Sequence, residues 1–131
     1  MTPVRQKPHV LMMSEITVDG KLTLKKGASS KILMRHMAPE TEVLLHRTRA
    51  EYDAIMVGSR TIRIDNSFLT VRLVEGKSPI RIIPNSDADI SLSSNVLRPD
   101  APTIIAVSEK APAGRVSAIR ETGAIVVTAG E

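Results

Sequence analysis

Short apolar runs alternate with longer polar stretches along most of the chain. Four of these runs, bounded by turn-forming residues, are typical of buried β-strands and cover residues 54–57, 80–83, 103–107 and 124–128. Helices are predicted over residues 39–50 and 111–122, the second with Gly123 just past its end. A short helical turn is predicted to begin at Ser59 or Thr61. This alternation predicts an α/β fold with a largely parallel sheet that helices cover on both faces.

The first part of the chain carries a different pattern. Residues 9–18 are mostly apolar and end on a β-branched residue, which predicts a buried strand that one acid, Glu15, interrupts. Residues 19–20 form a turn signal, and residues 21–24 alternate as the arm of a hairpin does. Residues 25–31 are basic and rich in hydroxyls, so we expect a loop there.

Two further stretches are less regular. Residues 69–73 predict a short extended piece, and residues 87–100 predict a polar loop with one weak strand. The run 124–128 stands near the end of the sequence with no helix after it. We therefore interpret residues 1–131 as one partial domain that is truncated at its C-terminus or completed by a partner.

Composition narrows the class of protein. Hydrophobic residues make up 42% of the chain, with one Tyr, one Phe and no Trp, so the core is aliphatic and stacking platforms for single-stranded nucleic acid are nearly absent. The net charge of +4 is spread along the chain, which fits a small anionic ligand. Nucleic-acid binding is a weaker alternative, and no nucleic-acid partner is expected.

The sequence also argues against several kinds of site. It has no cysteine, and its histidines, His9, His36 and His46, stand in no metal-ligand spacing, so no metal site is expected. No apolar stretch approaches the ~18 residues of a membrane span, and no signal peptide opens the chain. We expect a soluble cytoplasmic protein without a membrane partner.

Candidate chemistry concentrates in residues 53–72. A strand ends there at Gly58, and hydroxyl and arginine side chains follow where a helix would start. Backbone N–H groups at a helix start lack partners, and the helix dipole favours negative charge. The segment therefore predicts a site for a phosphorylated ligand or cofactor at the carboxyl edge of the sheet, with Thr61, Asp65 and Arg72 in one shared pocket.

Several separated motifs, in the right order, resemble the reductases of riboflavin biosynthesis, which act on a diaminopyrimidinone or aminouracil ribosyl 5-phosphate. The motifs are Thr17-Val18-Asp19-Gly20-Lys21, residues 49–58, Asp65-Asn66, Leu69-Thr70-Val71-Arg72 and residues 79–83. The resemblance covers nearly the whole chain but only the first part of a family domain. It implies a dihydrofolate-reductase-like fold with a mainly parallel, mixed sheet, a homodimer, and hydride transfer from NADPH that opens the ribosyl group to a ribityl chain.

Position within these motifs implies roles for individual residues. The resemblance implies cofactor contacts by Gly58, Thr61, Asp65, Asn85 and Ser86. It implies substrate contacts by Ser30, Lys31, Leu69 and Arg72. Arg72 would bind the 5′-phosphate, because a planar guanidinium donates two parallel hydrogen bonds to it.

Proton handling is where the chain departs from the family. Met13 stands where many members carry a polar residue, and Glu15 occupies a position that is usually small. Either the proton-handling group has moved to Glu15 or Ser14, or the substrate differs. The resemblance also makes Asp19 a catalytic candidate, although its place in a turn signal explains it equally well. Glu15 is alternatively a register break that faces solvent.

The function and several residue roles each admit a second interpretation. The glycine-rich segment that closes over the cofactor pyrophosphate in the family is absent, so a catalytically inert fragment is one alternative function. A reductase of the same fold that acts on a pterin is another. Thr61 could simply cap a helix, Arg72 could be an exposed strand end, and His46 is expected on the solvent face of its helix with Glu42 and Arg49.

Overall fold

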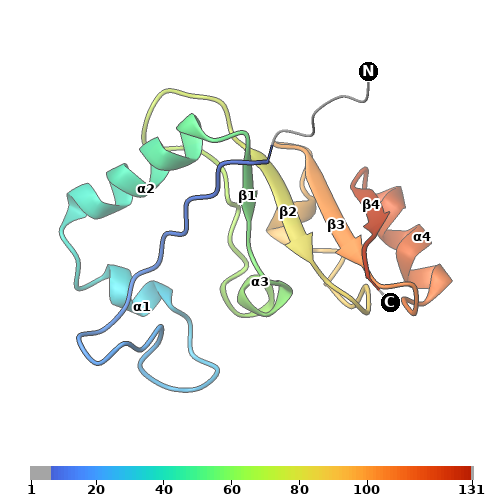
Figure 1. The fold of residues 1–131 in the computed structure, drawn as a ribbon, viewed down its shortest axis with the longest axis horizontal. Coiled ribbons are helices and arrows are strands. Elements are labelled where there is room, and N and C mark those ends of the chain that lie inside the picture. The colour runs from blue at the N-terminus through green and yellow to red at the C-terminus, as the bar shows by residue number, and fades with distance from the viewer. Residues whose placement is uncertain (1–6, 131) are drawn as a thin grey trace.

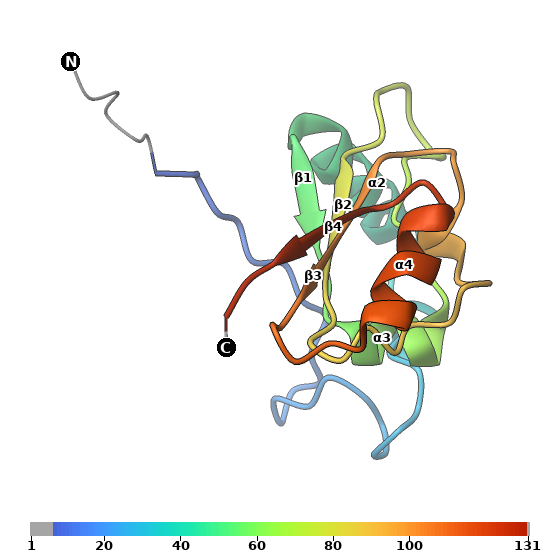
Figure 2. The same cartoon turned by 90° about the vertical axis from the view of Figure 1, so that its right-hand side faces the viewer.

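The computed structural model describes residues 7–130 (Figures 1 and 2). Its strands form one four-stranded sheet in the order β1-β2-β3-β4, with bounds β1 (Ala54–Met56), β2 (Ile80–Pro84), β3 (Thr103–Val107) and β4 (Ile125–Thr128). The helices are α1 (Lys31–Met34), α2 (Pro39–Glu51), α3 (Ser59–Asp65), the short 3₁₀-helix η1 (Asn95–Leu97) and α4 (Ala113–Glu121). The α/β alternation predicted for the second half of the chain is confirmed.

Both longer helices are confirmed, with ends within two residues of the predicted ones: α2 ends one residue later than expected, and α4 begins two residues later and ends one residue earlier. Pro39 occupies the first turn of α2, where its missing N–H costs nothing, and Glu40 and Glu42 lie in the same turn. Pro112 is the N-cap of α4, and Gly123 follows its C-terminus with a φ of 92°. That left-handed conformation is the one a glycine adopts without strain.

Every strand pairs in parallel with the next strand of the sequence. Ala54 lies opposite Ile80 in the first pair, and Ile104 lies opposite Ile125 in the last. The sheet of the described residues is therefore wholly parallel and not mixed, in contrast to the expectation.

Helices lie on one face of the sheet only, which corrects the expectation of two covered faces for residues 7–130. Figure 2 shows α3 and α4 on the same side of the strands. Right-handed crossovers between successive neighbouring strands place their connections on one side. Side chains alternate accordingly, because Ile83 and Ile105 are 0% exposed, whereas Met56 is 66% and Ile125 57% exposed.

The hydrophobic core fills the space between the covered face and its helices. Residues 87–100 contribute to it more than a polar loop would, because Ile90 and Val96 are 0% exposed. In place of the weak strand expected there, the segment forms η1. The core residues are Ile62, Leu69, Ile83, Ala88, Ile90, Val96, Leu97, Ile105, Val107, Ile119 and Ala124.

The first described segment is not part of the sheet. Residues 7–30 form no helix or strand, so the buried strand predicted over 9–18 and the hairpin arm predicted over 21–24 are wrong. Met12 is 91% exposed and Val18 fully exposed. A strand needs a neighbouring strand for its backbone hydrogen bonds, and none of the four strands β1–β4 pairs with this segment.

No helix within residues 7–130 combines the length and the apolar character needed to cross a bilayer.

Candidate functional site

Residues 69–72 lie against α2, which holds their backbone through two side chains. The Nδ1 atom of His46 accepts a hydrogen bond of 3.0 Å from the backbone N–H of Arg72. One turn further along, Nη1 of Arg49 donates to the carbonyl oxygen of Thr70 at 3.3 Å. Residues three apart on a helix share a face, which explains why both side chains reach the same segment.

Further side chains bind the neighbouring peptide groups. The backbone N–H of Val71 donates to the Ser78 hydroxyl at 3.0 Å, and Nη1 of Arg81 donates to the Phe68 carbonyl at 3.2 Å. Leu69 is buried and has a φ of 57°, so the chain turns sharply here. The extended piece predicted over 69–73 is thus no strand, and side chains supply the partners that a strand would.

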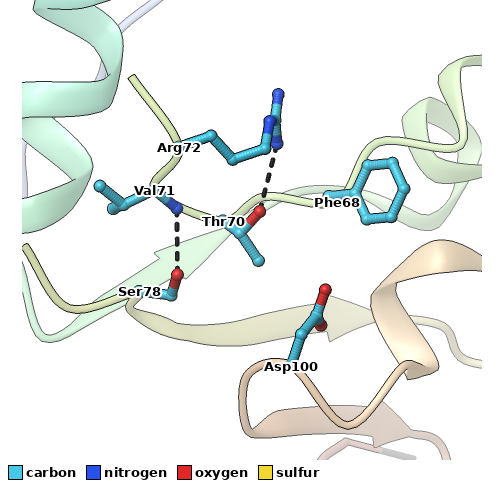
Figure 3. A pocket seen from close by; sticks show the side chains of 6 residues that line it. All are labelled: Phe68, Thr70, Val71, Arg72, Ser78 and Asp100. Carbon is cyan, nitrogen blue, oxygen red and sulfur yellow. Dashed lines mark hydrogen bonds between the residues drawn. The ribbon is translucent and has the colours of Figure 1, made fainter. Parts of the chain in front are cut away.

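Arg72 stands at the rim of an open hollow of about 320 Å³ (Figure 3). Its Nη1 donates to the Thr70 hydroxyl at 3.2 Å, and its Cζ lies 5.7 Å from the centre of the Phe68 ring. Arg98 approaches the same ring at 5.7 Å, so two cations flank Phe68. The hollow is lined by Phe68, Thr70, Val71, Arg72, Ser78 and Asp100.

Positive charge dominates this region. Both guanidinium groups bond Thr70, Arg49 at its carbonyl oxygen and Arg72 at its hydroxyl, so the two cations lie close together. Burial lowers the pKa of the Arg49 guanidinium, and so does the charge of Arg72. Neither forms an ion pair within residues 7–130, where the pairs are Lys21 with Asp19, Arg63 with Asp89 and Arg81 with Asp100. The carboxylate in the hollow, Asp100, is bound by Arg81 at 2.8 Å.

A second cluster surrounds Asp65 at the end of α3. The Ser30 hydroxyl donates to Oδ2 of Asp65 at 3.1 Å, and Nζ of Lys31 donates to its carbonyl oxygen at 2.5 Å. The other carboxylate oxygen, Oδ1, is buried without a hydrogen-bond partner among the described residues. The structure thus brings a predicted cofactor residue together with two predicted substrate residues.

The first turn of α3 carries Gly58 and Thr61. Gly58 is the N-cap with no side-chain cap bond on this helix, so Thr61 does not cap it. Thr61 is exposed. A Cβ at Gly58 would meet nothing within 4 Å, which leaves room for a ligand. Neither Thr61 nor Asp65 lines the hollow beside Arg72. That hollow is therefore not the pocket that the sequence predicts these three residues to share.

Asn85 and Ser86 follow β2. Asn85 is 3% exposed, and its side chain donates to Asp89 at 2.6 Å and accepts from the N–H of Ile90 at 3.0 Å. Its amide is therefore occupied within the protein. Ser86 is exposed at the carboxyl edge of the sheet, and its carbonyl accepts from the N–H of Ser108 at 3.0 Å.

The two acidic candidates lie in different surroundings. Asp19 is exposed in the turn that the sequence predicts, where hydrogen bonds from Lys21 and Thr17 lower the pKa of its carboxyl group. Glu15 is partly buried, and its negative charge opposes the lowering of the Arg49 pKa. Glu15 therefore lies near the cluster of cations, whereas the contacts of Asp19 are local.

Two residues of α2, His46 and Arg49, contact the segment 69–72 although neither was predicted as a site residue. His46 is 1% exposed, so its expected place on the solvent face is wrong. Burial lowers the pKa of His46, as do the charges of Arg49 and Arg72, while Glu42 opposes them. Arg49 belongs to a motif that carried the resemblance, and the sequence places it on one helix face with His46. In the structure both side chains bond residues 70–72, so the expected direction of that face toward solvent is wrong.

Comparisons with known proteins identify the family of the chain. Residues 8–129 match the family model of the RibD C-terminal domain. The 2,5-diamino-6-ribosylamino-4(3H)-pyrimidinone 5′-phosphate reductase of Aquifex aeolicus is 52% identical over 127 residues, which are 96% of this chain and 57% of that protein. Its namesake in Methanothermobacter thermautotrophicus is 36% identical over 92% of this chain and 55% of that protein.

A solved structure extends the likeness to the fold. The crystal structure of a diaminohydroxyphosphoribosylaminopyrimidine deaminase/5-amino-6-(5-phosphoribosylamino)uracil reductase from Thermotoga maritima matches with a TM-score of 0.58 at 26% identity, over 88% of this chain and 37% of that chain. The present chain spans little more than half the length of the reductases that it matches. On its sequence and its fold, the chain belongs to the family of RibD C-terminal domains.

Proposed function

We propose that the chain binds NADPH and a phosphorylated ribosylamino-pyrimidine and takes part in reducing the ribosyl group to its ribityl form. The pair Arg49 and Arg72 carries the proposal, because these neighbouring cations have no carboxylate in ion-pair contact within residues 7–130. Such a pair attracts an anion, and the reductases that the chain resembles are named for a 5′-phosphate substrate. The dihydrofolate-reductase-like fold and the homodimer stay predictions from the resemblance.

Arg72 is the residue best suited to the phosphate. It is exposed, and the Thr70 hydroxyl orients its guanidinium. Arg49 adds a second positive charge from α2. Because the Leu69 side chain is buried in the core, a substrate contact by this residue would be made through its peptide groups.

The cluster around Asp65 fits NADPH. A buried carboxylate oxygen without a partner is ready to accept a hydrogen bond from a ligand hydroxyl or amide. Two exposed hydroxyl groups lie at the carboxyl edge of the sheet, those of Thr61 and Ser86. Between the end of β1 and α3, Gly58 leaves open space where a side chain would stand. NADPH, when bound, supplies the hydride, and the protein binds, orients and excludes water. Asn85 would act indirectly, by shaping the turn after β2.

The reaction also consumes a proton. Glu15 is the candidate nearer the proposed phosphate site, because its charge acts on Arg49, whereas the contacts of Asp19 are local. Asp19 has a lowered pKa, so it is ionised at neutral pH and has no proton to donate. Asp19 would therefore have a structural role, since its bonds to Thr17 and Lys21 stabilise the turn that precedes Ser30 and Lys31.

Substitution of the two arginines tests the phosphate site. We expect Arg72→Met and Arg49→Met to weaken binding of ribose 5-phosphate, followed by nuclear magnetic resonance, by about 30-fold or about 2 kcal/mol each. Arg47→Met is the matched control, because Arg47 is exposed on the same helix. The affinity for NADPH, measured by fluorescence, should stay unchanged in all three variants. Equal phosphate binding by Arg72→Met and the wild type would overturn the assignment.

The inert fragment and the pterin reductase separate in the same set of measurements. If NADPH fails to bind at millimolar concentration, the chain is an inert fragment of a reductase. If NADPH oxidation is faster with dihydrofolate than with the diaminopyrimidine phosphate, the chain is a pterin reductase.

A further inference from the structure

His46 is the buried link between α2 and Arg72. Its ring is 1% exposed, and its Nδ1 receives the backbone N–H of Arg72 at 3.0 Å. A ring nitrogen accepts a hydrogen bond only when it carries no proton. The ring must therefore be neutral, with its single proton on Nε2.

The surroundings of His46 favour that neutral form. Arg49 from the same helix and Arg72 from the facing segment place positive charge beside the ring, and burial disfavours a further charge. Glu42, one turn earlier on α2, is the negative group that acts in the opposite direction. Charge and burial together keep Nδ1 available as an acceptor.

The position of Arg72 depends on this bond. Its peptide N–H lies outside the strands of the described sheet, so no ladder hydrogen bond replaces the one to His46. Its guanidinium is hydrogen-bonded to Thr70, two residues away on the same segment. Loss of the His46 acceptor would leave a peptide group unpaired and free the backbone that aims the guanidinium.

We propose that His46 is a positioning residue for phosphate binding, which holds the backbone of Arg72 through a neutral ring with a free Nδ1. The inference rests on the proposed function in one respect, since it takes Arg72 as the phosphate ligand. His46 itself touches neither phosphate nor cofactor.

Two variants of His46 test the proposal. The side-chain oxygen of Asn lies near the place of Nδ1, so His46→Asn keeps an acceptor, whereas His46→Leu keeps an apolar body and removes it. We expect His46→Leu to weaken binding of ribose 5-phosphate by about tenfold and His46→Asn to stay within about threefold of the wild type. The NADPH affinity should be the same in both, because neither substitution removes a hydrogen bond of the Asp65 cluster, whose partners are Ser30 and Lys31.

A spectroscopic measurement on the unaltered protein adds an independent test. Nitrogen-15 resonances of the imidazole should report an unprotonated Nδ1 and a protonated Nε2 at neutral pH. The proposal is overturned if Nδ1 carries the proton, if His46→Leu binds ribose 5-phosphate like the wild type, or if Asn binds it no better than Leu. The tautomer reading decides the matter should His46→Leu fail to fold.

Arg72→Met distinguishes this failure from failure of the proposed function. If Arg72→Met lowers phosphate affinity and His46→Leu does not, only the role of His46 is wrong. If neither variant lowers it, the phosphate site itself is wrong.

Discussion

At the residue scale, the candidate site consists of side chains that bind backbone. His46, Arg49 and Ser78 each bond a peptide group of the segment that ends at Arg72. Charged and polar side chains of this kind look like surface residues in the sequence. Their partners are backbone N–H and C=O groups that lie outside helices and strands. Each bond therefore satisfies a peptide group, and the hydrophobic pattern of the sequence does not reveal this role.

The neutral state of His46 should make the folded protein less stable at acid pH. Its pKa is lowered by burial first and by Arg49 and Arg72 next, so below about pH 6.5 the unfolded chain binds a proton that the folded chain does not. As the pH decreases below about 6.5, the free energy of unfolding should decrease, by at most about 1.4 kcal/mol per pH unit, until the pH reaches the folded-state pKa of His46.

Urea denaturation at several pH values measures this effect. Between about pH 7.5 and about pH 5.5 the wild type should lose more stability than His46→Asn, which has no proton to take up. Parallel curves for the two proteins would contradict a buried neutral ring.

At the element scale, one buried side chain joins β2 to the loops at the amino ends of β2 and β3. Arg81 is 0% exposed, and its guanidinium donates to Asp100 and to the carbonyls of Phe68, Arg98 and Ala101. Its Nε donates to the Thr103 hydroxyl on β3 at 2.9 Å. A single strand residue therefore positions both walls of the hollow that Arg72 borders.

Arg81→Met should destabilise the fold severely. The substitution removes a guanidinium that is 0% exposed and leaves the carbonyl oxygens of Phe68, Arg98 and Ala101 without that donor. Each oxygen left buried and unsatisfied costs about 1–3 kcal/mol, whereas the loss of the ion pair adds little because Asp100 is 42% exposed. Urea denaturation measures the loss, and Arg120→Met, at an exposed position of α4, should change the free energy of unfolding by less than about 0.5 kcal/mol. A loss below about 1 kcal/mol for Arg81→Met would show that these bonds contribute little net stability.

At the scale of the whole molecule, stability is distributed unevenly. The sheet, α3, η1 and α4 enclose the core, whereas residues 7–30 have no regular structure and expose most of their apolar side chains. Their described contacts to the rest of the chain include the His9 ring stacked on Tyr52, with centres 5.9 Å apart, and the Ser30 bond to Asp65. Few such contacts oppose local opening.

Brief trypsin treatment should therefore cut this segment first. Lys25 and Lys26 are exposed outside any helix or strand, so cleavage there should be at least about tenfold faster than after Arg120 in α4. Mass spectrometry of the early products identifies the cuts, and Lys25→Gln with Lys26→Gln should slow their appearance. An early cut after Arg120 instead would mean that α4 opens as readily as this segment.

The sequence by itself determined the α/β class, the four strands, α2 and α4, and the family to which the chain belongs. These follow from apolar periodicity, from Pro and Gly at helix ends, and from ordered motifs, all of which are local. Ser30, Lys31 and Asp65 were also predicted as site residues, and the fold brings them together.

Only the tertiary structure decided which apolar segments are buried and which polar side chains face inward. Residues 9–18 have a strand-like pattern, yet a strand exists only beside another strand. His46 and Arg81 are polar, yet each is buried because a distant peptide group or carboxylate offers it a partner. The hollow beside Arg72 and the cluster around Asp65 likewise depend on long-range contacts that periodicity does not encode, namely the bonds from α2 to residues 70–72 and the bond from Ser30 to Asp65.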